Sequence, residues 1–311
     1  MDVVRGHAQC PPWSGAAVAI GNFDGVHVGH RAVVDRARAM ANDAGTGTKV
    51  VALTFDPHPS AVLSATAPRI QIASLSRRLE LLAAAGADAV VVEAFTRDYA
   101  AREATHFVDE ILVQALRAKA VVVGYDYTYG RARSGSIETL CTHTAELGIA
   151  CAVVPPFEVD GEIASSTKIR GFLKAGDLVR AERMLGRPWD VDGSVVHGAK
   201  RGRAIGIPTA NIAPASDLII APGIYAVTMS VEGGPERLGV ASLGTNPTFV
   251  AQGGLVLEVH LLDFDGDLYN RNVRTTFVAR LRDEIAYAGV EPLLAQIRQD
   301  IVEARAIFAA R

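Results

Sequence analysis

The chain has 311 residues, a length that accommodates two domains of ordinary size. Hydrophobic residues make up 49% of it and charged residues 21%, so it can bury cores and is not a disordered chain. The formal net charge of −3 argues against a dedicated binder of nucleic acid or of anionic membranes.

The cysteines and the amino-terminal residues indicate a cytoplasmic protein. Three cysteines, an odd number without C-x-x-C spacing, favour reduced thiols over a disulfide framework or a zinc ribbon. The first twenty residues contain Arg5, Pro11 and Pro12 and lack the apolar segment of a signal peptide. No apolar run approaches the ~18–20 residues that span a bilayer. We expect no nucleic-acid or membrane partner, and the sequence leaves the oligomeric state open.

The first half alternates buried strands with amphipathic helices. Uninterrupted Val- and Ile-rich runs between such helices predict a parallel sheet covered on both faces, whose ligands bind beyond the carboxyl ends of the strands. The prediction for residues 1–185 is a doubly wound α/β domain. Strands are expected at 16–20, 49–55, 88–95, 120–124 and 150–154, and helices at 30–44, 76–85, 101–117 and 137–147.

The second half has a different pattern, with short strands separated by glycine-rich turns. Such strands without intervening helices predict an antiparallel barrel or sandwich in residues 186–311. Residues 263–267 (DFDGD) lack the glycine and glutamate of a calcium loop, so a hairpin turn at 265–266 is expected. Helices are expected at 169–175, 178–185 and 291–309, and strands at 224–231, 238–242, 255–264 and 272–281.

Residues 21–30 (GNFDGVHVGH) join the first strand to the first helix. Their glycines let the backbone approach a ligand closely, and a helix N-terminus attracts anions. His27 and His30 add donors that suit charge developing on an α-phosphate under attack. Two other interpretations are histidines that only cap or pack, and a metal pair, although no third Cys or His is close in sequence.

This string resembles the HxGH signature of the nucleotidylyltransferase superfamily and, in particular, the bacterial FAD synthetase family. Three further segments are similar to motifs of that family: 54–59 (TFDPHP), 124–130 (GYDYTYG) and 165–170 (SSTKIR). The resemblance implies a Rossmann-like nucleotidylyltransferase domain in which His27, His30 and Arg170 are catalytic. It also implies ligand contacts by Gly21, Asn22, Asp24, Gly29, Asp126, Tyr127, Ser166 and Thr167.

The residue types fit these roles, although each also has a simpler structural explanation. Ser166 and Thr167 offer hydroxyls at a helix start, and Arg170 offers a guanidinium fork for phosphate oxygens, although a plain N-cap also explains the hydroxyls. Tyr127 and Tyr129, which replace two Phe of the family motif, can stack on a ligand ring or belong to the core. Asp56, His58 and Asp126 are weaker site candidates, because turn formation accounts for much of the occurrence of such residues.

Residues 198–211 form a glycine-rich, basic segment that lacks a Walker A sequence. Exposed amides beside basic side chains suit a polyphosphate, although most glycine-rich loops are only turns. Thr209 and Asn211 present neutral oxygens of the kind that Mg²⁺ accepts beside substrate phosphates. The expected ATP contacts are Gly198, Lys200, Gly202 and Gly206.

Within this segment, 206–211 (GIPTAN) resembles the signature of riboflavin kinases. Segments 222–226 (PGIYA), 244–249 (GTNPTF), 257–264 (LEVHLLDF) and 277–284 are similar to further motifs of that family. The resemblance implies an antiparallel β-barrel with a terminal helix.

Glu258 lies in an otherwise apolar strand, on the same face as His260 by two-residue alternation. A carboxylate there is costly unless it is paired or used. The resemblance implies that Glu258 is the general base for the riboflavin 5′-hydroxyl; a surface-facing glutamate is the alternative. Asn270 stands where the family usually has Gly, and Asn tolerates the positive φ of such a turn.

Together the two resemblances cover about residues 17–310 and predict a bifunctional enzyme. Riboflavin and Mg-ATP would give FMN, and FMN with a second ATP would give FAD and pyrophosphate. The rivals are an adenylyltransferase for another substrate and a non-catalytic flavin- or nucleotide-binding regulator.

Overall fold

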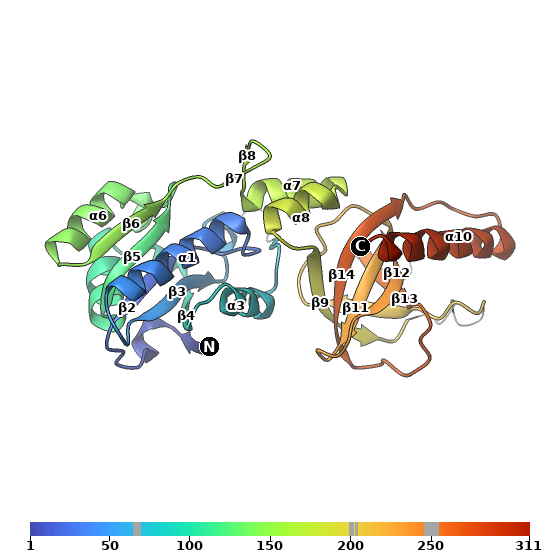
Figure 1. Ribbon diagram of the computed structural model, residues 1–311, viewed down its shortest axis with the longest axis horizontal. Coiled ribbons are helices and arrows are strands. Elements are labelled where there is room, and N and C mark those ends of the chain that lie inside the picture. Colours follow the sequence, from blue (N-terminus) through green and yellow to red (C-terminus); the bar gives the residue numbers. More distant parts are fainter. Residues whose placement is uncertain (65–69, 199–201, 203–204, 246–254) are drawn as a thin grey trace. The chain divides into compact units, whose positions relative to one another are not determined.

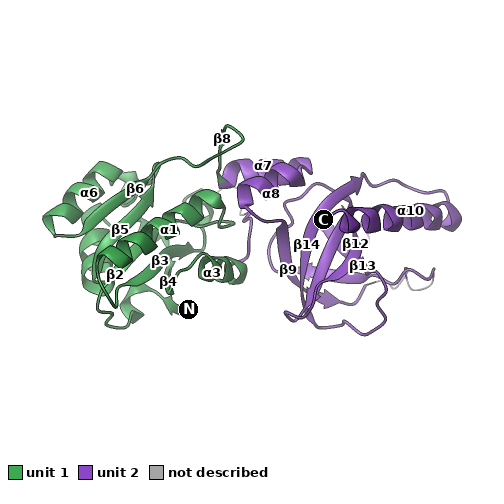
Figure 2. Ribbon diagram, in the orientation of Figure 1, with its two compact units in different colours: residues 1–69, 75–165 green, residues 70–74, 166–311 purple. Residues whose placement is uncertain are grey.

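The computed structural model describes residues 1–64, 70–198, 202, 205–245 and 255–311 (Figure 1). Backbone contacts divide the chain into two compact units (Figure 2). The first comprises residues 1–69 and 75–165, and the second comprises 70–74 and 166–311. This division places residues 166–185 with the second unit, whereas the sequence-based boundary lies at residue 185 and stays a prediction.

The first unit is built on a six-stranded sheet in which every pairing is parallel. Its order is β1-β4-β3-β2-β5-β6, which confirms the predicted doubly wound sheet. The edge strand β1 was not expected, because it is short and mostly exposed and so lacks an apolar run. The strands are β1 (Asp2–Arg5), β2 (Ala16–Ile20), β3 (Lys49–Asp56), β4 (Ala89–Ala94), β5 (Ala118–Gly124) and β6 (Ala150–Val154).

Helices cover both faces of this sheet because successive residues of its buried strands point to opposite sides. Ala17 and Ala19 of β2 pack with α1 and α3 on one face, and Val18 packs with the π-helical segment and α6 on the other. The helices are η1 (His7–Gln9), α1 (Val28–Asp43), α2 (Pro59–Leu63), α3 (Leu75–Ala84), α4 (Arg97–Ala100), α5 (Ala104–His106), π-helical η2 (Phe107–Ala115), η3 (Arg131–Arg133) and α6 (Ile137–Glu146). A short ribbon of β7 (Glu158–Val159) and β8 (Glu162–Ile163) follows.

The helix expected at 101–117 is formed by two consecutive pieces, α5 and η2, and α4 lies before its predicted start. Part of it is wound as a π-helix, as the hydrogen bond from Leu116 N to Ile111 O (2.9 Å) shows. An apolar period alone does not distinguish this winding from an α-helix.

The strand order places the site-bearing loops side by side. From β2 the chain proceeds outward to β3 and β4, and then crosses back to β5 on the other side of β2. The direction of winding therefore changes between β2 and β5, and ligands of such sheets bind at this point, beyond the carboxyl ends of the strands.

The second unit is a closed antiparallel barrel, so the barrel is confirmed and the sandwich excluded. The barrel order is β10-β13-β12-β11-β14-β9. Two helices precede it and one follows. The elements are α7 (Ser166–Ala175), α8 (Leu178–Leu185), β9 (Trp189–Val196), β10 (Ala210–Pro214), β11 (Gly223–Val231), β12 (Arg237–Thr245), β13 (Leu255–Leu261), β14 (Asn272–Arg282) and α10 (Val290–Ala309).

The hairpin expected at 265–266 is wrong. β13 pairs with β12 and β10, whereas β14 pairs with β11 and β9, so residues 262–271 connect two strands that are not neighbours. Arg305 of α10 holds this connection through both carboxylate oxygens of Asp263, at 2.8 and 2.7 Å. The expected turn at Asn270 is confirmed: its φ is 62°, and its N–H donates to Val195 O at 2.9 Å.

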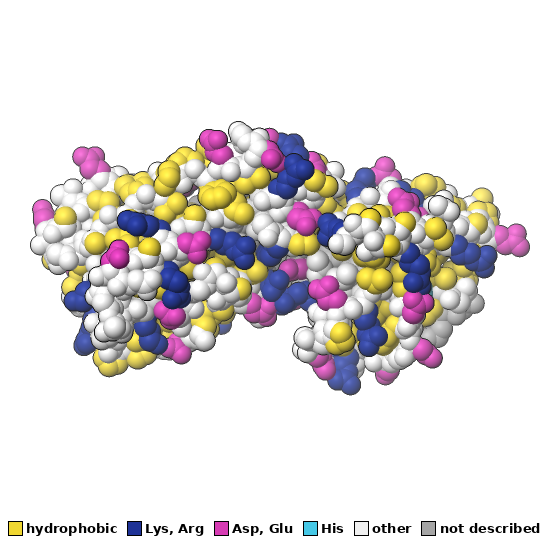
Figure 3. Space-filling model, in the orientation of Figure 1, with side chains coloured by type: hydrophobic (Ala, Val, Ile, Leu, Met, Phe, Trp, Pro, Cys, Tyr) yellow, Lys and Arg dark blue, Asp and Glu magenta, His cyan; other side chains and the backbone are white. Residues whose placement is uncertain are grey.

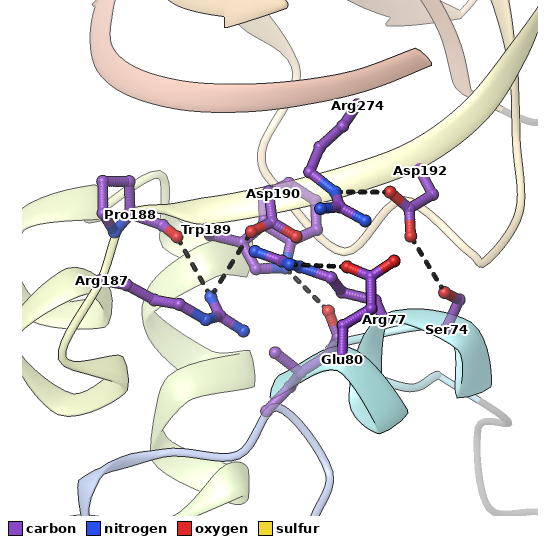
Figure 4. A network of polar contacts seen from close by, with 10 residues as sticks. Ser74, Arg77, Glu80, Arg187, Pro188, Trp189, Asp190, Asp192 and Arg274 are labelled. Carbon is purple, nitrogen blue, oxygen red and sulfur yellow. Dashed lines mark hydrogen bonds and ion pairs between the residues drawn. The ribbon is translucent and has the colours of Figure 1, made fainter. Parts of the chain in front are cut away.

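Residues 70–74, from the first half of the sequence, are fixed to β9 and β14 (Figure 4). The buried Trp189 Nε1 donates to Ile72 O at 2.9 Å. Ser74 Oγ donates to one carboxylate oxygen of Asp192 at 3.4 Å, and Arg274 Nε donates to the other at 2.7 Å. This segment therefore completes the second unit although it precedes it by more than ninety residues of sequence.

The cysteine prediction needs correction. Cys141 of α6 and Cys151 of β6, expected as reduced thiols, form a disulfide with a Cα–Cα distance of 5.3 Å. Packing of α6 against β6 brings the two positions together, which residue spacing does not reveal. Cys10 is a half-buried free thiol.

The surface charges and the described helices fit the composition of the chain. On the face shown in Figure 3, basic and acidic side chains are interspersed over both units. The described helices include none with the length and apolarity of a membrane span.

Candidate active sites

The first candidate site is the loop that leaves β2 at the point where the winding changes. His27 is the N-cap of α1, and its Nδ1 accepts a hydrogen bond from His30 N at 3.4 Å. The His27 and His30 rings stack, with centroids 3.7 Å apart and planes inclined by 22°. Gly29 permits this packing, because a Cβ there would lie 3.1 Å from the His27 ring. The capping interpretation is therefore correct for His27, and it also places both rings at one helix N-terminus.

Both histidines are uncharged at neutral pH. Burial lowers the pKa of His27 to about 4. Burial also lowers the pKa of His30 well below its usual value, and the charges of His27 and Arg78 lower it further. Because His27 Nδ1 is an acceptor, the proton of its neutral ring is on Nε2. The site therefore offers a neutral N–H donor and not an imidazolium ion.

Sequence reasoning missed a further residue of this site, Arg78 of α3. Its side chain is 1% exposed, and Nη1 donates to Asn22 O at 2.9 Å. Thr54 Oγ1 donates to the same carbonyl at 3.1 Å, and Arg78 Nη2 lies 3.7 Å from Asp56 Oδ1. The sequence contains a pattern that could have identified it. Arg78 is at helical spacing from Leu81 and Leu82 and so lies on the apolar face of the predicted helix.

The ends of β3 and β5 contribute further predicted residues. His58 caps α2, with Nδ1 accepting from Ser60 N at 3.2 Å, which agrees with the turn interpretation of that segment. Tyr129 is buried against Phe107 with ring centroids 5.4 Å apart, so it belongs to the core. Tyr127 stacks on Tyr129 at 5.7 Å and is half-buried, so part of its surface stays accessible.

The structure thus brings most of the predicted residues of the first site to neighbouring loops of one sheet edge. Asp24 is 2% exposed in the loop after β2, whereas Asp126 is exposed beyond β5. Ser166, Thr167 and Arg170 lie on α7 in the second unit, where Arg170 Nη2 donates to Thr167 Oγ1 at 3.4 Å. Their place beside the histidines stays a prediction.

The second candidate site lies on the outer face of the barrel. Leu257, Val259 and Leu261 of β13 are buried, whereas Glu258 and His260 share the other, half-buried face, as predicted. The barrel register places Glu258 opposite Asn211 of β10 on one side and opposite Ser242 of β12 on the other.

The loop that precedes β10 is shaped around the predicted metal ligands. A Cβ at Gly198 would lie 2.3 Å from Asn211 Nδ2, so only glycine lets the chain pass this close to the Asn211 amide. The Gly202 carbonyl accepts from Ile205 N and Ile207 N, and a Cβ at Gly202 would lie 3.4 Å from Thr209 Oγ1.

One backbone angle and one side-chain contact define the end of this loop. Gly206 has a φ of 80°, which favours glycine. His260 Nδ1 contacts Pro208 O at 2.8 Å and ties the residues before Thr209 to β13. The predicted ATP contact Lys200 lies outside the described residues.

Comparison with known proteins gives a separate family match for each half of the chain. A model of FAD synthetase matches residues 10–168, and a model of riboflavin kinase matches residues 185–308. A bifunctional riboflavin kinase/FMN adenylyltransferase of Listeria monocytogenes is 39% identical over 94% of this chain and 92% of its own length. The enzyme of the same name from Escherichia coli K12 is 36% identical over 99% of this chain and 98% of its own. The chain belongs to this bifunctional family.

A solved structure is similar to this chain over nearly its whole length. A crystal structure from Streptococcus pneumoniae, described as a macrolide-efflux protein, has a TM-score of 0.87 and 29% identity, covering 98% of this chain and 99% of that one. That description applies to the other protein. In this family member, the loop at 21–30 lies within the FAD synthetase match, and Glu258 and Asn211 lie within the riboflavin kinase match.

Proposed function

We propose that this protein makes FAD from riboflavin in two ATP-dependent steps. The second unit transfers the γ-phosphate of Mg-ATP to riboflavin, giving FMN and ADP. The first unit joins FMN to the adenylyl group of a second ATP, giving FAD and pyrophosphate. The observation that supports this most strongly is that two separate compact units each carry a candidate site within one of the two family matches.

In the kinase step, Glu258 accepts the proton of the riboflavin 5′-hydroxyl as that oxygen attacks the γ-phosphorus. A new O–P bond forms, and the bond between the γ-phosphorus and the bridging oxygen breaks, so that ADP leaves. Thr209 and Asn211 contribute neutral oxygen ligands to the Mg²⁺ that enters with ATP. The proposal is supported by the register, in which Asn211 is paired with Glu258. The loop at 198–206 contributes backbone amides to the phosphates.

In the adenylyl step, a phosphate oxygen of FMN attacks the α-phosphorus of ATP, and pyrophosphate leaves from the opposite side. No covalent enzyme intermediate is required. Charge on the pentacoordinate phosphorus is stabilised by N–H donors of His27 and His30, by the N-terminus of α1 and by Arg170. Because the histidines are neutral, Arg170 is the positively charged group of this set. Tyr127 and Asp126 would contact the nucleotide or the flavin.

Two rival functions make different predictions. An adenylyltransferase for another substrate would leave Glu258 and Asn211 without a use. A non-catalytic binder would bind flavin or nucleotide without turnover. A cytoplasmic location and the absence of nucleic-acid and membrane partners remain part of our proposal.

The test is to incubate purified protein with riboflavin, ATP and Mg²⁺ and to separate the flavins by chromatography. We expect FMN to appear first and FAD to follow. Conversion of added FMN without phosphorylation of riboflavin would contradict the kinase half of the proposal, and unchanged riboflavin and FMN would contradict the proposed function.

A further inference from the structure

Arg78 connects two motifs that lie more than thirty residues apart in sequence. From α3, its Nη1 donates to the carbonyl of Asn22 in the loop after β2. Its Nη2 lies 3.7 Å from Asp56 Oδ1 at the end of β3. The guanidinium group therefore joins the two adjacent strand ends from which the first candidate site is built.

The Asn22 carbonyl is held from two directions, because Thr54 Oγ1 donates to it as well, at 3.1 Å. In a trans peptide the carbonyl and the following N–H point in opposite directions. Fixing the Asn22 carbonyl therefore fixes the orientation of the Phe23 N–H on the other side of the loop.

The loop needs such an anchor. Phe23 and Val26 have φ values of 51° and 42°, and such values are strained for residues with a Cβ. Strained residues persist where surrounding contacts impose them. The same loop ends at the His27 N-cap, so its conformation sets the position of the two stacked rings.

The hydrogen bonding of Arg78 is incomplete for a buried arginine. Among the described residues, neither Nε nor Nη2 has a hydrogen-bond partner. Unpaired buried donors are unfavourable for folding, so stability alone does not account for an arginine at this position.

Three titratable groups interact electrostatically with the guanidinium group. The carboxylates of Asp24 and Asp56 act on it as opposite charges, and its own charge lowers the pKa of His30, which stacks on His27. The charge of Arg78 thus supports the neutral state of His30.

We propose that Arg78 is a positioning residue for adenylyl transfer, which holds the loop at 21–26 through the Asn22 carbonyl and aligns it with Asp56. The proposal rests on the adenylyltransferase function proposed above. Arg78 itself need not touch a substrate, because it acts through the loop that carries the histidines.

The test compares Arg78→Met and Arg78→Lys with the wild-type enzyme. FMN adenylylation is followed for kcat and KM, riboflavin phosphorylation is followed in the same samples, and thermal unfolding is recorded. Arg38→Met is the matched control: Arg38 also joins a carbonyl, Gly86 O, to a carboxylate, Asp88, but at the amino end of β4.

We expect Arg78→Met to lower the kcat of adenylylation by about 100-fold, the loss that misplacement by 1 Å can cause, with a smaller change in KM. Arg78→Lys keeps the charge without the fork and should be intermediate. Phosphorylation of riboflavin should be unchanged in both.

Equal kcat values for Arg78→Met and Arg38→Met would overturn the proposal, as would a lowered unfolding temperature with wild-type kcat. Should Arg78→Met not fold, a wild-type kcat in Arg78→Lys would overturn it. Absence of FMN adenylylation in the wild-type enzyme would instead refute the proposed function.

Discussion

Glu258 of β13 lies directly opposite Asn211 of β10 in the register of the barrel. Side chains at such paired positions share one face, with Cβ atoms about 4.5–5.5 Å apart. In the proposed kinase step, this placement would let Glu258 act on the hydroxyl and Asn211 on the magnesium ion bound to the phosphate that the hydroxyl attacks. The two residues should therefore affect the same reaction with different kinetic signatures.

Glu258→Gln should lower the kcat of riboflavin phosphorylation by about 10²–10⁴-fold, the usual contribution of a positioned general base. The KM for riboflavin and the conversion of FMN to FAD should change little. Glu236→Gln is the control, since Glu236 is an exposed carboxylate of the same unit that binds Thr228 Oγ1 at 2.9 Å. Equal kcat values for the two variants would show that Glu258 is not the base.

Gly198→Ala should raise the KM for Mg-ATP in the kinase step, because the new Cβ would displace the Asn211 amide. Asn211→Ala should have the same effect by removing the ligand oxygen. The double variant should then be no worse than Asn211→Ala alone, since both changes act through one group. Additive effects on KM in this double-mutant cycle would contradict the role of Asn211.

The histidines of the first site should titrate far below the usual range. NMR titration of the imidazole resonances should give His27 a midpoint near its pKa of about 4, with His30 neutral throughout the range above it. His27→Gln identifies the His27 resonance by its loss. A midpoint near 6.5 for either ring would refute the argument that the site uses neutral donors.

The lowered pKa of His27 also makes the free energy of unfolding depend on pH. The folded-state pKa of His27 is depressed, so between pH 6.5 and 4 the unfolded chain binds the proton that the folded chain excludes. The stabilisation is fully present above pH 6.5 and is lost on acidification toward pH 4, up to roughly 3 kcal/mol at 1.36 kcal/mol per pKa unit. Denaturant unfolding of the first unit should show a smaller acid loss in His27→Gln than in wild type. Equal losses would contradict the burial of a neutral His27.

Much of the fold follows from local pattern. Continuous apolar runs such as 49–55 identify buried parallel strands, and glycine-punctuated strands identify the barrel. β9 was missed because Asp190 and Asp192 are unusual in strands. The carboxylate of Asp192 is accommodated by an ion pair with Arg274, at 2.7 Å, that no local pattern reveals.

The candidate sites likewise contain features that local sequence pattern predicts and features that it does not. The loops at 21–30 and 198–211 could be found because their glycines and polar side chains lie together in sequence. Arg78 and the Cys141–Cys151 disulfide could not, because each depends on which elements pack together. Helical spacing places Arg78 on a buried face, but only the folded structure shows that its side chain reaches the loop after β2.

The central claim is that each unit performs one of two consecutive reactions. The most direct test uses two variants, Glu258→Gln and His27→Ala/His30→Ala, each alone and then mixed, with riboflavin, ATP and Mg²⁺. We predict that the first variant leaves riboflavin unchanged, that the second stops at FMN, and that the mixture forms FAD. A folded variant that loses both reactions, or a mixture that forms no FAD, would contradict the account.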